Sequence, residues 1–161
     1  MAESSYTSKF AQVNGIRLHY LDWGGSGPAI CFLAGLGLSA YYYAAFALRF
    51  SGPFRVVALT RRGHGDSDCP ETGYDVETLA EDVRQFLDSL QIHRVILVGH
   101  SLANVELCHF AALYPDRLLK LVFLEAGYDG RIEKPVEEKN PLRGVHPPSK
   151  PPLPSRISSG N

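Results

Sequence analysis

The sequence has little of what several protein classes require. Its three cysteines, Cys31, Cys69 and Cys108, are too few and too scattered for a disulfide framework or a cysteine-rich zinc site. Sixteen basic against 17 acidic residues give a formal net charge of −1, which provides no positive excess to bind nucleic acid or an anionic membrane. No apolar run approaches the roughly 20 residues of a membrane span, and residues 1–9 lack the apolar stretch of a signal peptide. We therefore expect a cytoplasmic protein with no nucleic-acid or membrane partner, no metal and no cofactor.

Proline divides the chain into two parts. Residues 131–161 hold seven of the 11 prolines and few large aliphatic side chains, which favours extended or disordered backbone. Residues 1–130 carry nearly all of the periodic apolar pattern, and 161 residues suit one domain. We expect a core domain over residues 1–130 and a proline-rich tail over residues 131–161 that begins a cap region or is disordered.

Within the first part, strand and helix patterns alternate. Asn14-Gly15 lies between two strand-like runs and predicts a hairpin, because a type I′ turn needs positive φ at both central residues. Asp75 is placed to cap an amphipathic helix. The expected strands are 10–13, 16–23, 29–33, 56–59, 95–98 and 118–124, and the expected helices are 41–50, 76–90 and 102–114. This order predicts an α/β fold in which an N-terminal antiparallel hairpin joins a mostly parallel sheet with helices on both faces.

The motif Gly99-His100-Ser101-Leu102-Ala103 follows the strand 95–98 and opens the next helix. It fits the G-x-S-x-G nucleophile elbow, with alanine at the last position. The small residues Gly99 and Ala103 let strand and helix pass closely in a tight turn, which strains Ser101 and projects its hydroxyl beyond the sheet. The turn also places Ser101 at a helix N-terminus, where the N–H of Leu102 is the expected first oxyanion donor. The alternative is a serine that only caps an ordinary helix.

With the motifs around it, this elbow resembles the α/β-hydrolase superfamily in its serine-esterase-like branch. The matching stretches are Gly25-Ser26-Gly27-Pro28, Leu33-Ala34-Gly35-Leu36-Gly37, Arg62-Gly63-His64-Gly65-Asp66-Ser67, the elbow itself, Tyr114-Pro115-Asp116-Arg117 and Leu121-Val122-Phe123-Leu124-Glu125-Ala126. The resemblance implies an eight-stranded fold with a Ser–acid–His triad, and often a cap after the sixth strand. It further implies hydrolysis of a small carboxylic ester or amide through an acyl-enzyme on Ser101.

The chain departs from the family pattern in four places. Ala34-Gly35 replaces the usual His-Gly, although the backbone N–H of Leu36 still serves as the expected second oxyanion donor. Thr60 stands where the fourth strand usually ends in aspartate, and Asn104 stands where glycine is usual. The chain also stops soon after the sixth strand, without the strands that normally supply the histidine and usually the acid. We therefore expect an incomplete, truncated fold that is weakly active or inactive and that self-associates through its exposed sheet edge.

Because those strands are missing, candidates for the catalytic acid and base must come from other residues of the chain. Glu125 ends the sixth strand, where some members of the superfamily carry their acid; it otherwise pairs or caps at a strand end. His146 follows in the chain order Ser…acid…His but lies in the proline-rich tail. His100, next to the nucleophile, is expected to pack rather than act as the base. The remaining candidates expected as surface or loop residues are His19, His64 and His93.

Two other function classes compete with the hydrolase. Gly35-x-Gly37 with Ala40 fits the dinucleotide fingerprint after a strand, and Arg61 follows the next strand, where it could hold a 2′-phosphate. This NADP-binding interpretation leaves the preceding hairpin and the Ser101 elbow unexplained. The third class is a non-catalytic half-fold that interacts with a partner through its sheet edge.

Overall fold

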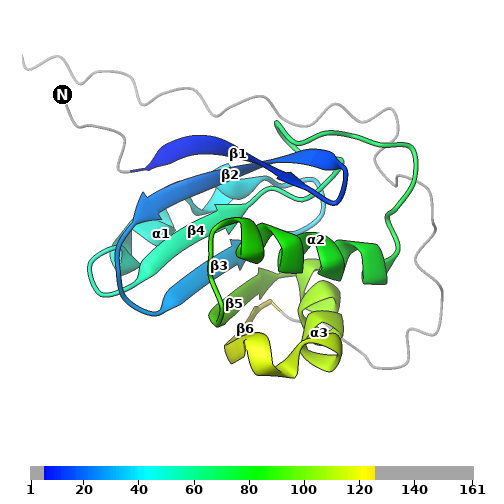
Figure 1. Ribbon diagram of the computed structural model, residues 1–161. Coiled ribbons are helices and arrows are strands. Elements are labelled where there is room, and N and C mark those ends of the chain that lie inside the picture. The colour runs from blue at the N-terminus through cyan, green and yellow to red at the C-terminus, as the bar shows by residue number, and fades with distance from the viewer. Residues whose placement is uncertain (1–5, 126–161) are drawn as a thin grey trace, which may run out of the picture.

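The computed structural model describes residues 6–125, and these form one mixed sheet with helices on both faces (Figure 1). The sheet order is β1-β2-β4-β3-β5-β6, in which β1, β2 and β4 pair antiparallel and the other neighbours pair parallel. The strand bounds are β1 Thr7–Val13, β2 Ile16–Gly24, β3 Ala29–Leu33, β4 Arg55–Leu59, β5 Val95–His100 and β6 Leu118–Leu124. The expected α/β class, with its antiparallel hairpin and largely parallel sheet, is confirmed.

The hairpin turn forms where the sequence predicted it. Asn14 and Gly15 have φ of 47° and 77°, so both central residues adopt the left-handed conformation of a type I′ turn. Val13 pairs directly with Ile16 across the turn. The turn thereby fixes the register of β1 on β2.

Helices α2 (Val76–Ser89) and α3 (Ala103–Leu113) lie side by side on one face of the sheet (Figure 1). Asp75 caps α2 as predicted, because its carboxylate accepts hydrogen bonds from the Thr78 amide at 2.8 Å and the Thr78 hydroxyl at 2.7 Å. A short turn, η3 (Pro115–Arg117), connects α3 to β6. The cap starts α2 beside the carboxyl ends of the central strands.

The segment on the opposite face differs from the single helix expected over residues 41–50. It consists of three short turns, η1 (Ala40–Tyr43), α1 (Ala44–Ala47) and η2 (Leu48–Phe50), none of which has a side-chain N-cap. Three rings of this segment, those of Tyr43, Phe46 and Phe50, pack around Phe32 of β3 at centroid distances of 4.8, 6.0 and 5.9 Å. Packing three bulky rings around one strand residue favours tight, irregular turns over a continuous helix.

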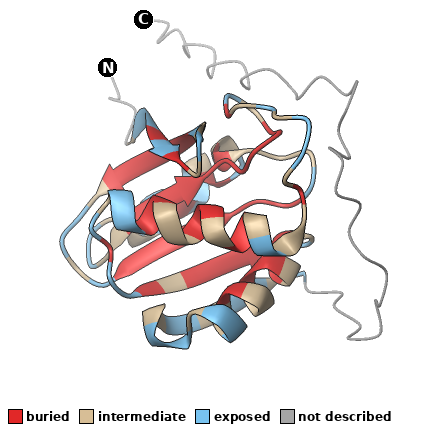
Figure 2. Ribbon diagram, turned by 45° about the vertical axis from the view of Figure 1, so that its right-hand side comes forward, coloured by how far each residue is buried: buried red, intermediate tan, exposed pale blue. Residues whose placement is uncertain are grey.

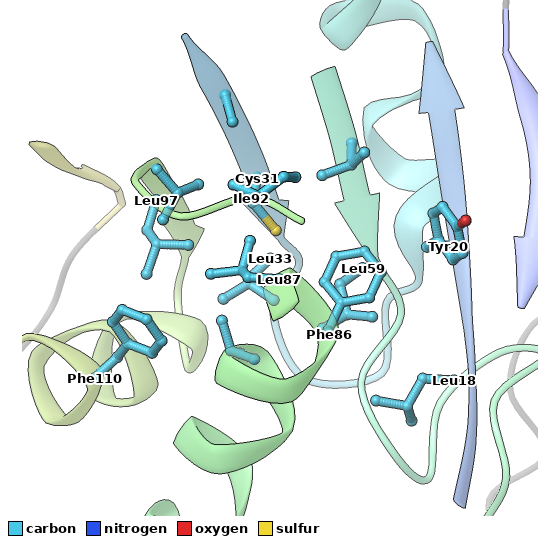
Figure 3. Close-up of a cluster of buried hydrophobic side chains, with 14 of the residues drawn as sticks. Leu18, Tyr20, Cys31, Leu33, Leu59, Phe86, Leu87, Ile92, Leu97 and Phe110 are labelled. Carbon is cyan, nitrogen blue, oxygen red and sulfur yellow. The ribbon is translucent and has the colours of Figure 1, made fainter. Parts of the chain in front are cut away.

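The larger core cluster lies between the sheet and α2/α3. Figure 3 shows Phe86 and Leu87 of α2 and Phe110 of α3 pointing toward Cys31, Leu33 and Leu59 of the sheet. Figure 2 shows the same layering, with buried residues concentrated on the central strands and on the inner faces of these helices. Truncating a fully buried phenylalanine such as Phe86 costs about 3–5 kcal/mol of stability. This packing provides a rigid base for the loops at the carboxyl ends of β3 and β5.

The expected boundary near residue 130 and the proline-rich tail lie outside the described residues. The division into a core of 1–130 and a tail of 131–161 therefore stays a prediction, as does the placement of His146 within that tail.

Candidate active site

The backbone at Ser101 has the strained geometry of a nucleophile elbow. Its φ is 53°, in the left-handed region that serine rarely occupies and that costs about 1–3 kcal/mol. β5 ends at His100 and α3 begins at Ala103, so the strand–turn–helix context is present. Ser101 is exposed, its amide donates to the Leu124 carbonyl at 3.2 Å, and its carbonyl accepts from the Asn104 amide at 3.0 Å. The turn therefore holds the serine at the carboxyl edge of the sheet.

Glycine at two positions allows the chain to approach this turn closely. A Cβ on Gly35 would lie 2.8 Å from Nδ1 of His100 and 3.2 Å from Cβ of Ser101. A Cβ on Gly99 would lie 2.9 Å from a methyl group of Leu107. The loop after β3 is thus in contact with the elbow after β5, and a side chain at Gly35 would separate them.

Two backbone amides beside Ser101 are available to an oxyanion. Within residues 6–125, neither the Leu36 nor the Leu102 amide donates a hydrogen bond to another protein group. Leu102 stands at the N-terminus of α3, where the helix dipole favours negative charge. Both leucines line the same hollow. The amides predicted as oxyanion donors therefore belong to segments that face one another across a gap.

That hollow lies between the loop after β3, the start of α2 and the start of α3. Counted as space open to the centre of a water molecule, its volume is about 30 Å³. The residues that line it are Leu36, Arg61, His64, Tyr74, Val76, Leu79, Leu102, Val105 and Glu106. Five are aliphatic, whereas four, Arg61, His64, Tyr74 and Glu106, carry ionisable groups.

The ionisable groups of the hollow are buried. Arg61 and Glu106 form an ion pair at 2.9 Å, with 7% and 3% of their side chains exposed. Burial raises the pKa of Glu106 to about 7, although the positive charge of Arg61 opposes the shift. Burial also lowers the pKa of His64 to about 4, and the charge of Arg61 acts in the same direction. At neutral pH His64 is uncharged and donates from Nδ1 to the Arg62 carbonyl at 2.9 Å.

In the sequence Arg61 was singled out only for the NADP-binding alternative, and Glu106 was not singled out. His19 and His64 were expected at the surface or in loops; His64 does lie in a loop, but both side chains are buried. The sequence contains a signal for Glu106, which falls on the same helical face as Ala103 and Phe110. A carboxylate on an inward face needs a buried partner.

Glu125 and His100 contact each other beside the elbow. Nε2 of His100 lies 3.1 Å from Oε2 of Glu125, whose side chain is 85% exposed. The His100 ring also stacks on Tyr42, with centroids 5.2 Å apart, in keeping with the packing role expected for it. Within the described residues, the Glu125 carboxylate thus pairs with this histidine. A role of Glu125 as the catalytic acid stays a prediction, and His146 lies outside the described residues.

The other departures from the family pattern have local partners. The Thr60 hydroxyl accepts from the Ala40 amide at 2.9 Å and lies 2.9 Å from Nδ1 of His19. Asn104 is buried and donates to the Leu124 carbonyl at 3.5 Å. Neither residue displaces the elbow from the geometry described above.

Arg61 is engaged differently from what NADP binding would require. Its guanidinium donates to the Ala34 carbonyl at 2.8 Å and pairs with Glu106 inside the fold.

Along residues 6–125, no group of three or more His, Cys, Asp or Glu residues is arranged to hold a metal ion. In the same part of the chain, no helix has the length and apolar character needed to cross a bilayer.

Comparison with known proteins places this architecture in a family. The alpha/beta hydrolase fold family matches residues 28–146. The chain is 33% identical to 2-(acetamidomethylene)succinate hydrolase of Mesorhizobium japonicum, covering 78% of this chain and 45% of that protein. It is 37% identical to the non-heme chloroperoxidase of Streptomyces lividans over 70% and 42% of the two chains. It is 36% identical to bifunctional epoxide hydrolase 2 of Mus musculus, covering 71% of this chain and 21% of that protein.

Solved structures agree with the sequence matches. The crystal structure of Cfl2 from Burkholderia cenocepacia superposes with a TM-score of 0.75 at 34% identity, over 82% of this chain and 46% of that one. The structure of E-2-(acetamidomethylene)succinate hydrolase gives a TM-score of 0.71 at 33% identity, covering 75% of this chain and 45% of that one. The chain spans less than half the length of these relatives. It belongs to the alpha/beta hydrolase fold family and contains part of that fold.

Proposed function

We propose that the chain carries the nucleophile portion of a serine hydrolase that acts on a carboxylic ester or amide through an acyl-enzyme on Ser101. The observation that supports this is the φ of 53° at Ser101, at the junction of β5 and α3. Strained backbone of this kind persists only where the surrounding structure enforces it, and it presents the hydroxyl to a substrate.

In the proposed reaction, the Ser101 oxygen attacks the carbonyl carbon of the substrate, and the carbonyl oxygen becomes an oxyanion. The amides of Leu36 and Leu102 donate hydrogen bonds to it. The serine proton passes to a base, the alcohol or amine leaves with a proton, and water then hydrolyses the acyl-enzyme. Glu125 is the proposed acid and His146 the proposed base.

The chain alone is expected to be weakly active or inactive. Without a positioned base, Ser101 keeps the ordinary pKa of an alcohol and is a poor nucleophile. Loss of triad members from serine hydrolases lowers the rate by several powers of ten, and the oxyanion donors retain only residual catalysis.

Reaction with a fluorophosphonate, followed by intact mass and peptide mapping, tests the proposal. We expect slow formation of one adduct on Ser101, none in Ser101→Ala, and an unchanged rate in Ser39→Ala, a neighbouring loop serine whose side chain does not cap η1. Absence of an adduct after prolonged exposure, or an equal adduct in Ser101→Ala, would refute the nucleophile. Fast stoichiometric labelling of Ser101 would instead show that residues of this chain already supply a base.

A reducing compartment, such as the cytoplasm, is the proposed location. Among the described residues, the three cysteines form no disulfide with one another: Cys31 is buried, Cys108 half-buried and Cys69 exposed. Cysteines without disulfides are typical of proteins from reducing compartments. Thiol titration of unfolded protein purified without reductant should return three thiols per chain, whereas a lower value would indicate disulfide formation.

A further inference from the structure

The Arg61–Glu106 pair links the two segments that carry the oxyanion donors. One guanidinium nitrogen of Arg61, Nη2, lies 2.8 Å from the Ala34 carbonyl oxygen and 2.9 Å from Oε1 of Glu106. Ala34 lies two residues before Leu36, and Glu106 lies four residues, about one helical turn, after Leu102. A single nitrogen therefore joins the loop after β3 to the first turn of α3.

The two segments also meet directly, where Gly35 contacts the elbow, and the Arg61–Glu106 pair is a second connection between them, in the wall of the hollow. Leu36, Leu102, Arg61 and Glu106 all line the same hollow. On the side of the hollow, where packed atoms do not fill the gap, the spacing between loop and helix depends on the groups that cross it. Arg61, in the loop after β4, contacts both sides there.

A contribution to stability alone does not explain the pair. Burying two charges removes their hydration, and replacing a buried pair with apolar residues of similar volume is often neutral or stabilising. Here the environment opposes the carboxylate, since burial raises the pKa of Glu106 to about 7. The pair is therefore better explained by the geometry it imposes than by stabilisation of the fold.

We propose that Arg61 and Glu106 are positioning residues that set the distance and relative orientation of the Leu36 and Leu102 amides. The proposal rests on the proposed function for its catalytic meaning, but its structural content is independent of any activity. Arg61 holds the Ala34 carbonyl on one side, and Glu106 holds Arg61 from α3 on the other. When the link is removed, the loop after β3 is free to move relative to α3.

A second buried pair provides a matched control. Arg62 and Asp82 contact at 2.6 Å with 5% and 4% of their side chains exposed, so the pair is at least as buried as Arg61–Glu106. Asp82 also accepts from the Asn14 side chain at 2.9 Å, which ties α2 to the hairpin turn and not to the oxyanion loop. Removing this pair tests the general effect of losing a buried ion pair.

The test compares the double variants R61M/E106L and R62M/D82L by NMR. Residual dipolar couplings report the orientation of the Leu36 and Leu102 N–H vectors relative to β5. We expect R61M/E106L to reorient at least one vector by more than the roughly 10–20° tolerated in functional sites, while R62M/D82L leaves both unchanged. Unchanged vectors in R61M/E106L, or equal changes in both variants, would overturn the proposal. If R61M/E106L does not fold, R61K keeps the charge but lacks the planar fork and reach of arginine, and the same reorientation is expected.

The rate of fluorophosphonate labelling at Ser101 measures how the same variants affect the proposed reaction. We expect the rate at Ser101 to fall at least tenfold in R61M/E106L and less than twofold in R62M/D82L. A wild-type chain that is not labelled would contradict the proposed function. The residual dipolar couplings of Leu36 and Leu102 would still show whether Arg61 and Glu106 position these amides. Reoriented vectors together with an unchanged labelling rate would show that the pair sets loop geometry without affecting the reaction, and would overturn the catalytic part.

Discussion

The candidate site joins two regions that are held in different ways. Ser101 and the amide of Leu36 follow β5 and β3, inner strands flanked on both sides by other strands. Glu125 instead follows β6, which lies at one edge of the described sheet (Figure 1). The first region is fixed by backbone conformation and glycine contacts, whereas Glu125 is a largely exposed side chain paired with His100. The difference shows that several described contacts fix the backbone at Ser101, whereas the Glu125 carboxylate is held among the described residues by its contact with His100.

The largest effect is expected from breaking the inner region at Gly35. A Cβ there would lie 2.8 Å from Nδ1 of His100, so Gly35→Ala must push the loop away from the elbow. Displacement of a reacting group by about 1 Å can cost on the order of 100-fold in rate. We expect Ser101 labelling to fall at least tenfold. In the control Gly52→Ala, a Cβ meets no atom within 4 Å and the rate should not change; normal labelling of Gly35→Ala would show that the close contact is not required.

The burial of the inner region is tested by the pH dependence of stability. His64 has a pKa of about 4 when folded, against 6.5 as its unperturbed value. Between these values the unfolded chain binds the extra proton, so this histidine makes stability fall as the pH decreases from about 6.5 to 4. The full shift corresponds to about 3 kcal/mol. Glu106 contributes in the opposite direction, since its raised pKa makes stability fall as the pH rises from about 4.5 toward 7.

The variant His64→Gln isolates the histidine from Glu106. Urea unfolding at pH 7 and pH 4.5 should show that the variant keeps more of its stability on acidification than wild type does, whatever Glu106 contributes to both. The control His93→Gln alters an exposed histidine and should show the same change with pH as wild type. Equal pH dependence in all three proteins would mean that His64 titrates in the folded state as it does in the unfolded one.

The edge region is tested by self-association. β1 exposes mainly polar side chains, whereas β6 exposes Leu119, Val122 and Phe123. Among the described residues β6 pairs only with β5, so its other side presents unpaired backbone groups. We propose that a second copy of the chain pairs along this side.

Size-exclusion chromatography over a concentration series measures this association. The wild-type chain should elute near twice its mass of 17.7 kDa at high micromolar concentration, and Val122→Lys should restore the monomer, since lysine protects sheet edges. The control Gln12→Lys adds the same charge to exposed β1 and should leave the dimer intact. A wild-type chain that is monomeric at every concentration would exclude the pairing.

The same contrast explains what the sequence could predict. The hairpin at Asn14-Gly15, the Asp75 cap and the Ser101 elbow are local, because a few adjacent residues determine the backbone. The Arg61–Glu106 pair joins the loop after β4 to α3 across a long stretch of sequence, and neither residue identifies its partner by local pattern. The segment 41–50 was misjudged for a related reason, because its rings pack around Phe32 of a different element. Local rules therefore located the turn at Ser101, the proposed nucleophile, but not the buried pair beside it.

The smallest effect is expected at Glu125. The proposed acid Glu125 can act only through a base that it holds, and among the described residues its contact is with His100, whose ring stacks on Tyr42 and which we expect to pack. Glu125→Gln should therefore lower the labelling rate of Ser101 by no more than about twofold, as should Glu71→Gln, the control at an exposed loop glutamate. Triad acids contribute about 10⁴-fold in serine hydrolases. A loss of 100-fold or more in Glu125→Gln alone would show that Glu125 already holds a base in this chain, and would mean that the edge region is held as firmly as the inner one.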